Sequence, residues 1–139
     1  MNIVRPVILL IENDPGDVFL FRRALAKQNF AGTVRVVATV QGALRYLTNR
    51  GDFTNEAYYP RPDLIVSDMN LGGHLGTELL EWLREQPALA DIPFVFLSGS
   101  WMPPDKARAQ ELGADAFYDK TGDIQQAAEH AAGMLELLR

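Results

Sequence analysis

Apolar runs of strand length alternate with amphipathic segments along the whole chain. The runs are short, and Val, Ile, Leu and Phe are frequent in them. Continuous apolar runs of this length are typical of strands that are buried on both faces of a sheet. The pattern predicts five strands, over residues 6–11, 33–38, 63–68, 92–100 and 114–120.

Segments with helical spacing follow the strands. Asp14 and Pro15 are typical of a helix N-cap followed by proline at the first helical position, and Val18, Phe21 and Leu25 then lie on one helical face. Further helices are expected around 40–47, over 77–86, over 103–113 and from Ile124 to the C-terminus. The segments 49–62 and 69–76 are expected to be loops, and the first is long enough to be an insertion or a contact surface.

Strand and helix alternate five times, which predicts an α/β fold of the (βα)5 type. This order is typical of a parallel sheet with helices on both faces, so we expect a doubly wound, five-stranded parallel sheet. Because the fifth helix takes up the rest of the chain, residues 1–139 are expected to form a single domain.

Composition narrows the classes of function. The net charge of −5 argues against a nucleic acid partner, because no basic excess is present to displace counterions from phosphates. No apolar run approaches the about 20 residues that span a bilayer, so we expect a cytoplasmic protein with no membrane partner. The chain has no cysteine, which excludes disulfides and thiolate catalysis. Its two histidines, His74 and His130, form no metal-binding motif.

Polar residues gather where the predicted strands end. In a doubly wound sheet, ligands bind beyond the carboxyl ends of the strands. The residues expected at that edge are Glu12, Asn13 and Asp14 after the first strand, Thr39 after the second, Asp68 and Asn70 after the third, Ser98 and Ser100 at the fourth, and Lys120 at the fifth. Together they place acids, hydroxyls and an ammonium group on one edge of the sheet.

These residue types suit phosphoryl transfer to a carboxylate. Asp68 is a candidate nucleophile, because a carboxylate can form an acyl phosphate. Glu12 and Asp14 would repel it unless a hard cation binds, and Mg²⁺ needs only one or two carboxylates together with waters and phosphate oxygens. Lys120 can pair with one phosphoryl oxygen and Ser98 can donate a hydrogen bond to another.

Four stretches identify a family. "ILLIENDPGDV", "DLIVSDMNLGG", "FVFLSGS" and "GADAFYDK" resemble, in this order and at these strand ends, the receiver domain of two-component response regulators. The resemblance covers essentially all 139 residues and implies the flavodoxin-like, CheY-like fold. The "NDPGD" opening and the long loop before the third strand are similar to the small stand-alone regulators that serve bacterial phytochrome-type histidine kinases.

The resemblance implies a role for each site residue. Asp68 would be the phosphoacceptor. Mg²⁺ would be bound by Glu12, Asn13, Asp68 and the backbone carbonyl of Asn70. Lys120 would be the lysine of the family's active site.

The resemblance also implies a conformational switch. Ser98 would be the switch hydroxyl. Phe117, three residues before Lys120, would be the aromatic side chain that swings inward when Ser98 engages the phosphoryl group. Trp101 either packs nearby or faces a partner, and the sequence leaves both interpretations open.

The first loop departs from the family pattern, which has two adjacent acids. Asn13 stands at the second position and an acid comes one residue later, at Asp14. Removing one negative charge should weaken the binding of Mg²⁺. Asp14 is either a substitute ligand or only the N-cap of the helix that follows. Thr121 follows Lys120 where the family usually has proline, which puts in doubt the rigid turn that aims the lysine.

The main functional hypothesis is a single-domain response regulator. It accepts a phosphoryl group from a sensor histidine kinase on Asp68 and signals by contact with a downstream protein or by phosphorelay. It is not an enzyme beyond its own phosphorylation and dephosphorylation, and it is expected to form a homodimer.

Two other functions remain to be weighed. The chain could be a degenerate receiver, an interaction module that is not phosphorylated because Asn13 spoils the metal site. A phosphatase of the haloacid dehalogenase type also uses an aspartate after a strand, but it needs a second acid where this chain has Asn70.

Overall fold

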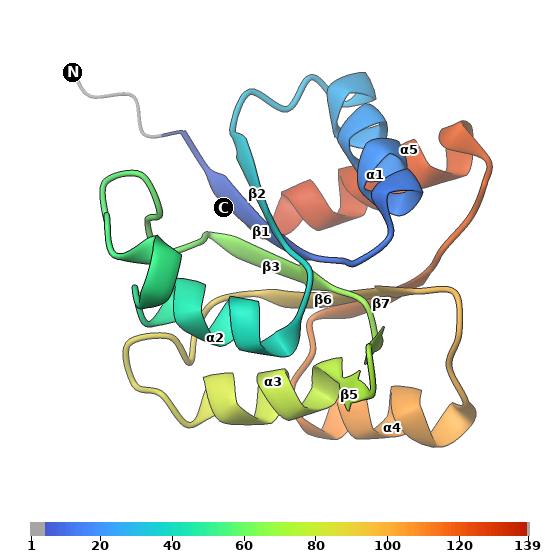
Figure 1. Cartoon of the computed structure of the whole chain (residues 1–139). Helices are drawn as coiled ribbons and strands as arrows, with labels where there is room; N and C mark the ends of the chain where they lie inside the picture. Colours follow the sequence, from blue (N-terminus) through green and yellow to red (C-terminus); the bar gives the residue numbers. More distant parts are fainter. Residues whose placement is uncertain (1–4, 139) are drawn as a thin grey trace.

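A five-stranded parallel sheet forms the centre of the molecule (Figure 1). The computed structural model describes residues 5–138. The strand order is β2-β1-β3-β6-β7, with all four neighbouring pairs parallel. The strands are β1 (Val7–Ile11), β2 (Thr33–Val37), β3 (Leu64–Ser67), β6 (Phe94–Ser98) and β7 (Ala116–Asp119). The expected α/β fold is therefore confirmed, and each predicted strand is present with somewhat shorter bounds.

Five α-helices cover the two faces of this sheet. They are α1 (Pro15–Lys27), α2 (Val40–Leu47), α3 (Gly76–Arg84), α4 (Pro103–Glu111) and α5 (Ile124–Leu135), and a 3-10 turn, η2, spans Glu136–Leu138. Helices α1 and α5 lie on one face, and α2, α3 and α4 lie on the other (Figure 1). The last helix was expected to continue to the C-terminus, but it ends at Leu135 and the 3-10 turn follows it; Arg139 lies outside the described residues.

Strand β1, which lies between β2 and β3, is buried along its whole length. Successive side chains point to opposite faces of a sheet, and Ile8 and Leu10 accordingly pack with α1 and α5. Leu9 and Ile11 pack with the helices on the other face. The continuous apolar run thus contributes to two separate cores, one on each face of the sheet. For this reason apolar and polar residues do not alternate along it.

The segment 69–76 is not a plain loop as predicted. Asn70–Leu71 (β4) and His74–Leu75 (β5) form a small antiparallel ladder. Gly72 and Gly73 make its turn with φ angles of 59° and 90°, a region that residues with a Cβ atom rarely adopt. The glycines that indicated a loop therefore form the tip of a hairpin.

The segment 49–62 is packed against α2. It contains a 3-10 turn, η1 (Gly51–Phe53), and the rings of Phe53 and Tyr59 lie 5.4 and 5.7 Å from that of Tyr46. The Tyr46 hydroxyl donates a hydrogen bond of 3.0 Å to the Pro60 carbonyl. Aromatic packing thus orders a segment for which sequence periodicity predicted only a loop.

Within residues 5–138, the structure contains no helix with the length and apolar character needed to cross a membrane.

Candidate functional site

The carboxyl ends of four neighbouring strands bring the predicted site residues together. Ile11 of β1 is paired with Ser67 of β3, so the residues that follow, Glu12 and Asp68, emerge side by side. Ser98, the last residue of β6, is paired with Asp119 of β7, and Lys120 comes next. The strand register thus gathers the four side chains that the sequence placed at this edge.

Asp68 has a hydrogen-bond donor at each carboxylate oxygen. Oδ1 accepts the Ser98 hydroxyl at 2.9 Å, and Oδ2 lies 2.9 Å from Nζ of Lys120. The side chain is only 11% exposed. Because each carboxylate oxygen has two lone pairs, both oxygens keep acceptor capacity while the orientation of the group is fixed.

Lys120 contacts three carboxylates. Its Nζ atom lies 2.7 Å from Oε1 of Glu12, 2.7 Å from Oδ2 of Asp17 and 2.9 Å from Oδ2 of Asp68. An ammonium group has three protons, so each carboxylate can take one. Burial works to lower the pKa of Lys120, but the hydrogen bonds with Asp17, Glu12 and Asp68 outweigh it and raise the pKa above its usual range.

Glu12 is a buried acid with 4% relative exposure. Its Oε2 atom accepts the backbone N–H groups of Asn13 at 2.9 Å and Asp14 at 3.1 Å. Its other oxygen faces Lys120. A charged group at this depth needs such partners, and the loop that follows β1 provides two of them from its own backbone.

Asp14 is the N-cap of α1. Its Oδ1 atom accepts the backbone N–H of Gly16 at 2.8 Å and that of Asp17 at 3.4 Å. Of the two interpretations of Asp14, the structure supports the helix cap. Asn13 is exposed and lines a groove of about 290 Å³ together with Thr39 and Gly72.

Asn70 joins two of the loops around the site. Its Nδ2 atom donates a hydrogen bond of 2.6 Å to the carbonyl of Ser100, and its backbone N–H lies 3.5 Å from Oδ1 of Asp68. The β4–β5 hairpin and the end of β6 are therefore connected directly beside Asp68.

Phe117 of β7 and Trp101, which follows β6, form an aromatic pair. Their ring centroids lie 5.3 Å apart with nearly perpendicular planes, and Phe117 also lies 5.7 Å from the buried ring of Phe96. The indole N–H of Trp101 donates a hydrogen bond to Asp119. Trp101 therefore packs against Phe117, and the residue itself is half-buried. The residue precedes α4, whose N-cap is Met102.

The chemistry of the site fits a hard divalent cation. Glu12 and Asp68 both bring an oxygen within 2.9 Å of the same ammonium group, so their carboxylates lie close together. The candidate metal ligands at this edge are oxygen atoms, which Mg²⁺ prefers. Within residues 5–138, no three His, Asp or Glu side chains are arranged as ligands of one ion. The carboxylates converge on Lys120 instead.

A comparison with known protein families agrees with this arrangement of Glu12, Asp68, Ser98 and Lys120. Residues 8–132 match the response regulator receiver domain. The chain belongs to this receiver domain family. The family and the CheY-like fold predicted from the four sequence stretches are thereby confirmed, and the phosphatase hypothesis, which Asn70 already weakened, is set aside.

Relatives of this receiver domain include phytochrome response regulators. Response regulator Rcp1 of Synechocystis sp. is 27% identical over 128 residues, which cover 92% of this chain and 85% of that protein. The structure of the phosphorylated cyanobacterial phytochrome response regulator RcpA is 30% identical, covers 97% of this chain and 94% of its own, and has a TM-score of 0.85. The Mn²⁺-bound form of Rcp1 is 27% identical, with a TM-score of 0.81 and coverage of 92% and 90%.

Sequence reasoning about this receiver domain missed Asp17. The residue lies in the first turn of α1, where an acid also serves to complement the helix dipole. A signal was present, because Asp17 comes four residues before Phe21, which is buried, and residues four apart share a helix face. Side chains in a helix also lean toward its N-terminus, which here is the functional edge of the sheet.

Proposed function

We propose that this response regulator accepts a phosphoryl group on Asp68 from the phosphohistidine of a sensor histidine kinase. The observation that supports the proposal is the pair of donors at Asp68. Ser98 lies 2.9 Å from one carboxylate oxygen and Lys120 lies 2.9 Å from the other. The two donors already orient this nucleophile, and after the transfer they can contact the negatively charged phosphoryl oxygens.

The transfer needs no separate base. An oxygen of Asp68 forms a bond to phosphorus as the bond from phosphorus to the donor nitrogen breaks, and the electron pair of that bond returns to the imidazole ring. Lys120 pairs with one phosphoryl oxygen and Ser98 donates a hydrogen bond to another. Hydrolysis of the acyl phosphate by water later restores the carboxylate. We propose no other reaction for this protein.

A divalent cation, Mg²⁺, completes the site in this proposal. Glu12, Asp68, the side chain of Asn13 and the backbone carbonyl of Asn70 would hold it. When bound, it neutralises the negative charge that Asp68 and the phosphoryl group share. The Mn²⁺-bound form of the relative Rcp1 supports a divalent cation in this part of the family.

The kinase partner is proposed to be of the phytochrome type. The similar structures include a phosphorylated phytochrome response regulator, RcpA, and a bacteriophytochrome response regulator, RtBRR, which is 30% identical and has a TM-score of 0.80 over 97% of this chain and 78% of its own. The output would be phosphorylation-dependent contact with a downstream protein in the cytoplasm, or phosphorelay. We also expect a homodimer and a single domain over residues 1–139.

The proposal is tested by incubating the protein with acetyl phosphate and Mg²⁺ and measuring its intact mass. We expect a gain of one phosphoryl group that is absent in Asp68→Asn. If the wild-type protein gains no mass at millimolar Mg²⁺, the degenerate receiver is the correct alternative. Asp119→Asn is a matched control, because it removes one charge from an exposed residue next to Lys120.

A further inference from the structure

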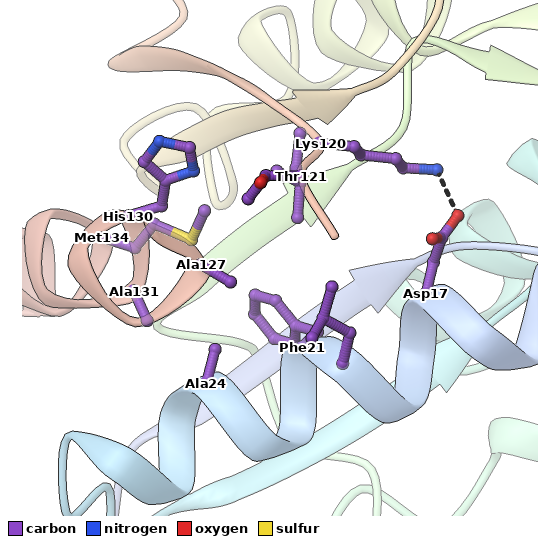
Figure 2. A pocket seen from close by; sticks show the side chains of 11 residues that line it. Asp17, Phe21, Ala24, Lys120, Thr121, Ala127, His130, Ala131 and Met134 are labelled. Atoms are coloured by element: carbon purple, nitrogen blue, oxygen red, sulfur yellow. Dashed lines mark hydrogen bonds and ion pairs between the residues drawn. The ribbon is translucent and has the colours of Figure 1, made fainter. Parts of the chain in front are cut away.

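The ion pair between Asp17 and Lys120 connects α1 to the end of β7. Figure 2 shows the two side chains pointing toward each other, Asp17 from α1 and Lys120 from the chain that follows β7. Their distance of 2.7 Å is as short as that from Lys120 to Glu12 and shorter than that to Asp68. Asp17 therefore contacts the ammonium group as closely as either acid predicted for the site.

Packing leaves space beside the side chain of Lys120. The stem of Lys120 borders a cavity of about 40 Å³ that Phe21, Leu97 and Thr121 also line (Figure 2). The stem also passes Gly99, which has no side chain to press against it. A flexible stem of four carbons with space beside it needs its charged end to be held.

Asp17 differs from the other two acids in its duties. In the proposed function, Asp68 carries the phosphoryl group and Glu12 holds the cation. Glu12 is also fixed by two backbone N–H groups. Asp17 is 35% exposed and has no role in either task. It is the carboxylate that can stay with Lys120 throughout the reaction.

We propose that Asp17 is a positioning residue that holds the ammonium group of Lys120 beside Asp68. Asp17 lies in the first turn of α1, which is a rigid element. It can therefore orient Lys120 although Thr121 replaces the proline that would make the following turn rigid. The inference rests on the proposed function, because it gives Lys120 a contact with the phosphoryl group. Asp17 itself touches neither the phosphoryl group nor its donor.

The test compares Asp17→Asn with Asp14→Asn. Both variants remove one charge from the same end of α1, and asparagine caps a helix about as well as aspartate. Asp14 does not contact Lys120, since its side chain binds the backbone of α1. Asp17→Glu, which keeps the charge, serves as the conservative rescue.

The first readout is the ¹⁵N signal of the lysine ammonium groups. The chain has only three lysines, and Lys120→Met assigns the signal of Lys120 by its loss. We expect a Lys120 signal slow to exchange with water in the wild type and in Asp14→Asn, broadened beyond detection in Asp17→Asn and recovered in Asp17→Glu. An unchanged signal in Asp17→Asn would overturn the inference. This readout requires no phosphorylation, so it decides the inference even if the proposed function fails.

The second readout is the rate of phosphorylation by acetyl phosphate with Mg²⁺. A misplaced catalytic group costs about tenfold to a hundredfold in rate, so we expect Asp17→Asn to be about tenfold slower. Asp17→Glu should recover at least half of the rate, and Asp14→Asn should match the wild type. Equal rates in Asp17→Asn and the wild type would overturn the positioning role.

Discussion

The hydroxyl of Ser98 donates a hydrogen bond of 2.9 Å to Oδ1 of Asp68, and both groups lie at the end of parallel strands one position apart in the sheet. Ser98 is fully buried at 0% exposure. Because this buried hydroxyl already contacts the acceptor aspartate, it can form a hydrogen bond with a phosphoryl group on Asp68. Trp101, which comes three residues after Ser98, packs against Phe117 of the neighbouring strand β7.

Replacing Ser98 by alanine should separate phosphorylation from the change that follows it. Lys120 still faces Asp68, so Ser98→Ala should be phosphorylated. The rate should be about tenfold lower, because the variant loses a hydrogen bond to a charged group, which is worth about 1.5 kcal/mol. The fluorescence of Trp101, isolated by Trp82→Phe, should no longer change on phosphorylation. Ser98→Thr keeps the hydroxyl and should keep the response. A full fluorescence change in Ser98→Ala would contradict the switch role.

Replacing Lys120 should reduce stability in a way that depends on pH. Lys120→Met leaves Glu12, Asp17 and Asp68 without their common cation, and the free energy of unfolding at pH 7 should fall by about 2–4 kcal/mol. Because the pKa of Lys120 is raised in the folded state, its contribution is fully present below the unfolded value of about 10.4 and is lost as pH rises through the folded value.

Urea unfolding of both proteins across pH measures this difference. It should stay constant from neutral pH to about pH 10 and shrink only at higher pH. Lys106→Met is the control, because Lys106 lies over the rings of Trp101 and Phe117 and forms no ion pair with the site. A difference that disappears between pH 7 and 9 would contradict the assigned ion pairs.

Restoring the second acid should tighten the binding of Mg²⁺. Asn13→Asp adds a charge beside Glu12, and an added charge about 4 Å from a cation is worth about 1–4 kcal/mol near a protein surface, so the dissociation constant should fall about tenfold or more. A titration followed by tryptophan fluorescence or calorimetry measures it. Asp14→Asn removes a charge from the helix cap and should change the constant less than twofold. No change in Asn13→Asp would show that the first loop was aligned wrongly.

Tyr46 should ionise above the usual pH range of a tyrosine. Burial raises its pKa to about 12, with Arg35 opposing the shift and Tyr59 adding to it. Titration of phenolate absorbance should therefore show a late step that Tyr46→Phe removes. The same variant loses the hydrogen bond to Pro60 and should be about 1 kcal/mol less stable. If the late step persists in Tyr46→Phe, the aromatic packing of the segment 49–62 is described wrongly.

Much of the fold was predictable because apolar runs and polar strand ends carry the information locally. Burial on both faces makes β1 continuously apolar, and the strand ends place Glu12, Asp68, Ser98 and Lys120 at one edge. The β4–β5 hairpin was missed because two glycines at a tight turn indicate a loop equally well. The packing of the segment 49–62 was missed because it depends on contacts with α2, which periodicity does not report.

The part of the site that could not be predicted depends on side-chain direction. Asp14 and Asp17 are both acids near the start of α1, but one faces the helix backbone and the other faces Lys120. Once the inward face of α1 is known, the two acids can be distinguished, because Asp17 lies four residues before Phe21 and therefore shares its face of the helix. The position of Trp101, in the segment after β6, likewise depends on Asp119 and Phe117, which lie on β7.

The central claim is that Asp68 carries the phosphoryl group although Asn13 replaces an acid, and mapping the modified residue tests it most directly. Borohydride reduces an acyl phosphate of aspartate to homoserine, which marks the phosphorylated position in the peptide sequence. After treatment with acetyl phosphate and Mg²⁺, we predict homoserine at position 68, and none there when Mg²⁺ is removed by chelation. Homoserine at another acid, such as Asp17, or at none, would contradict the account.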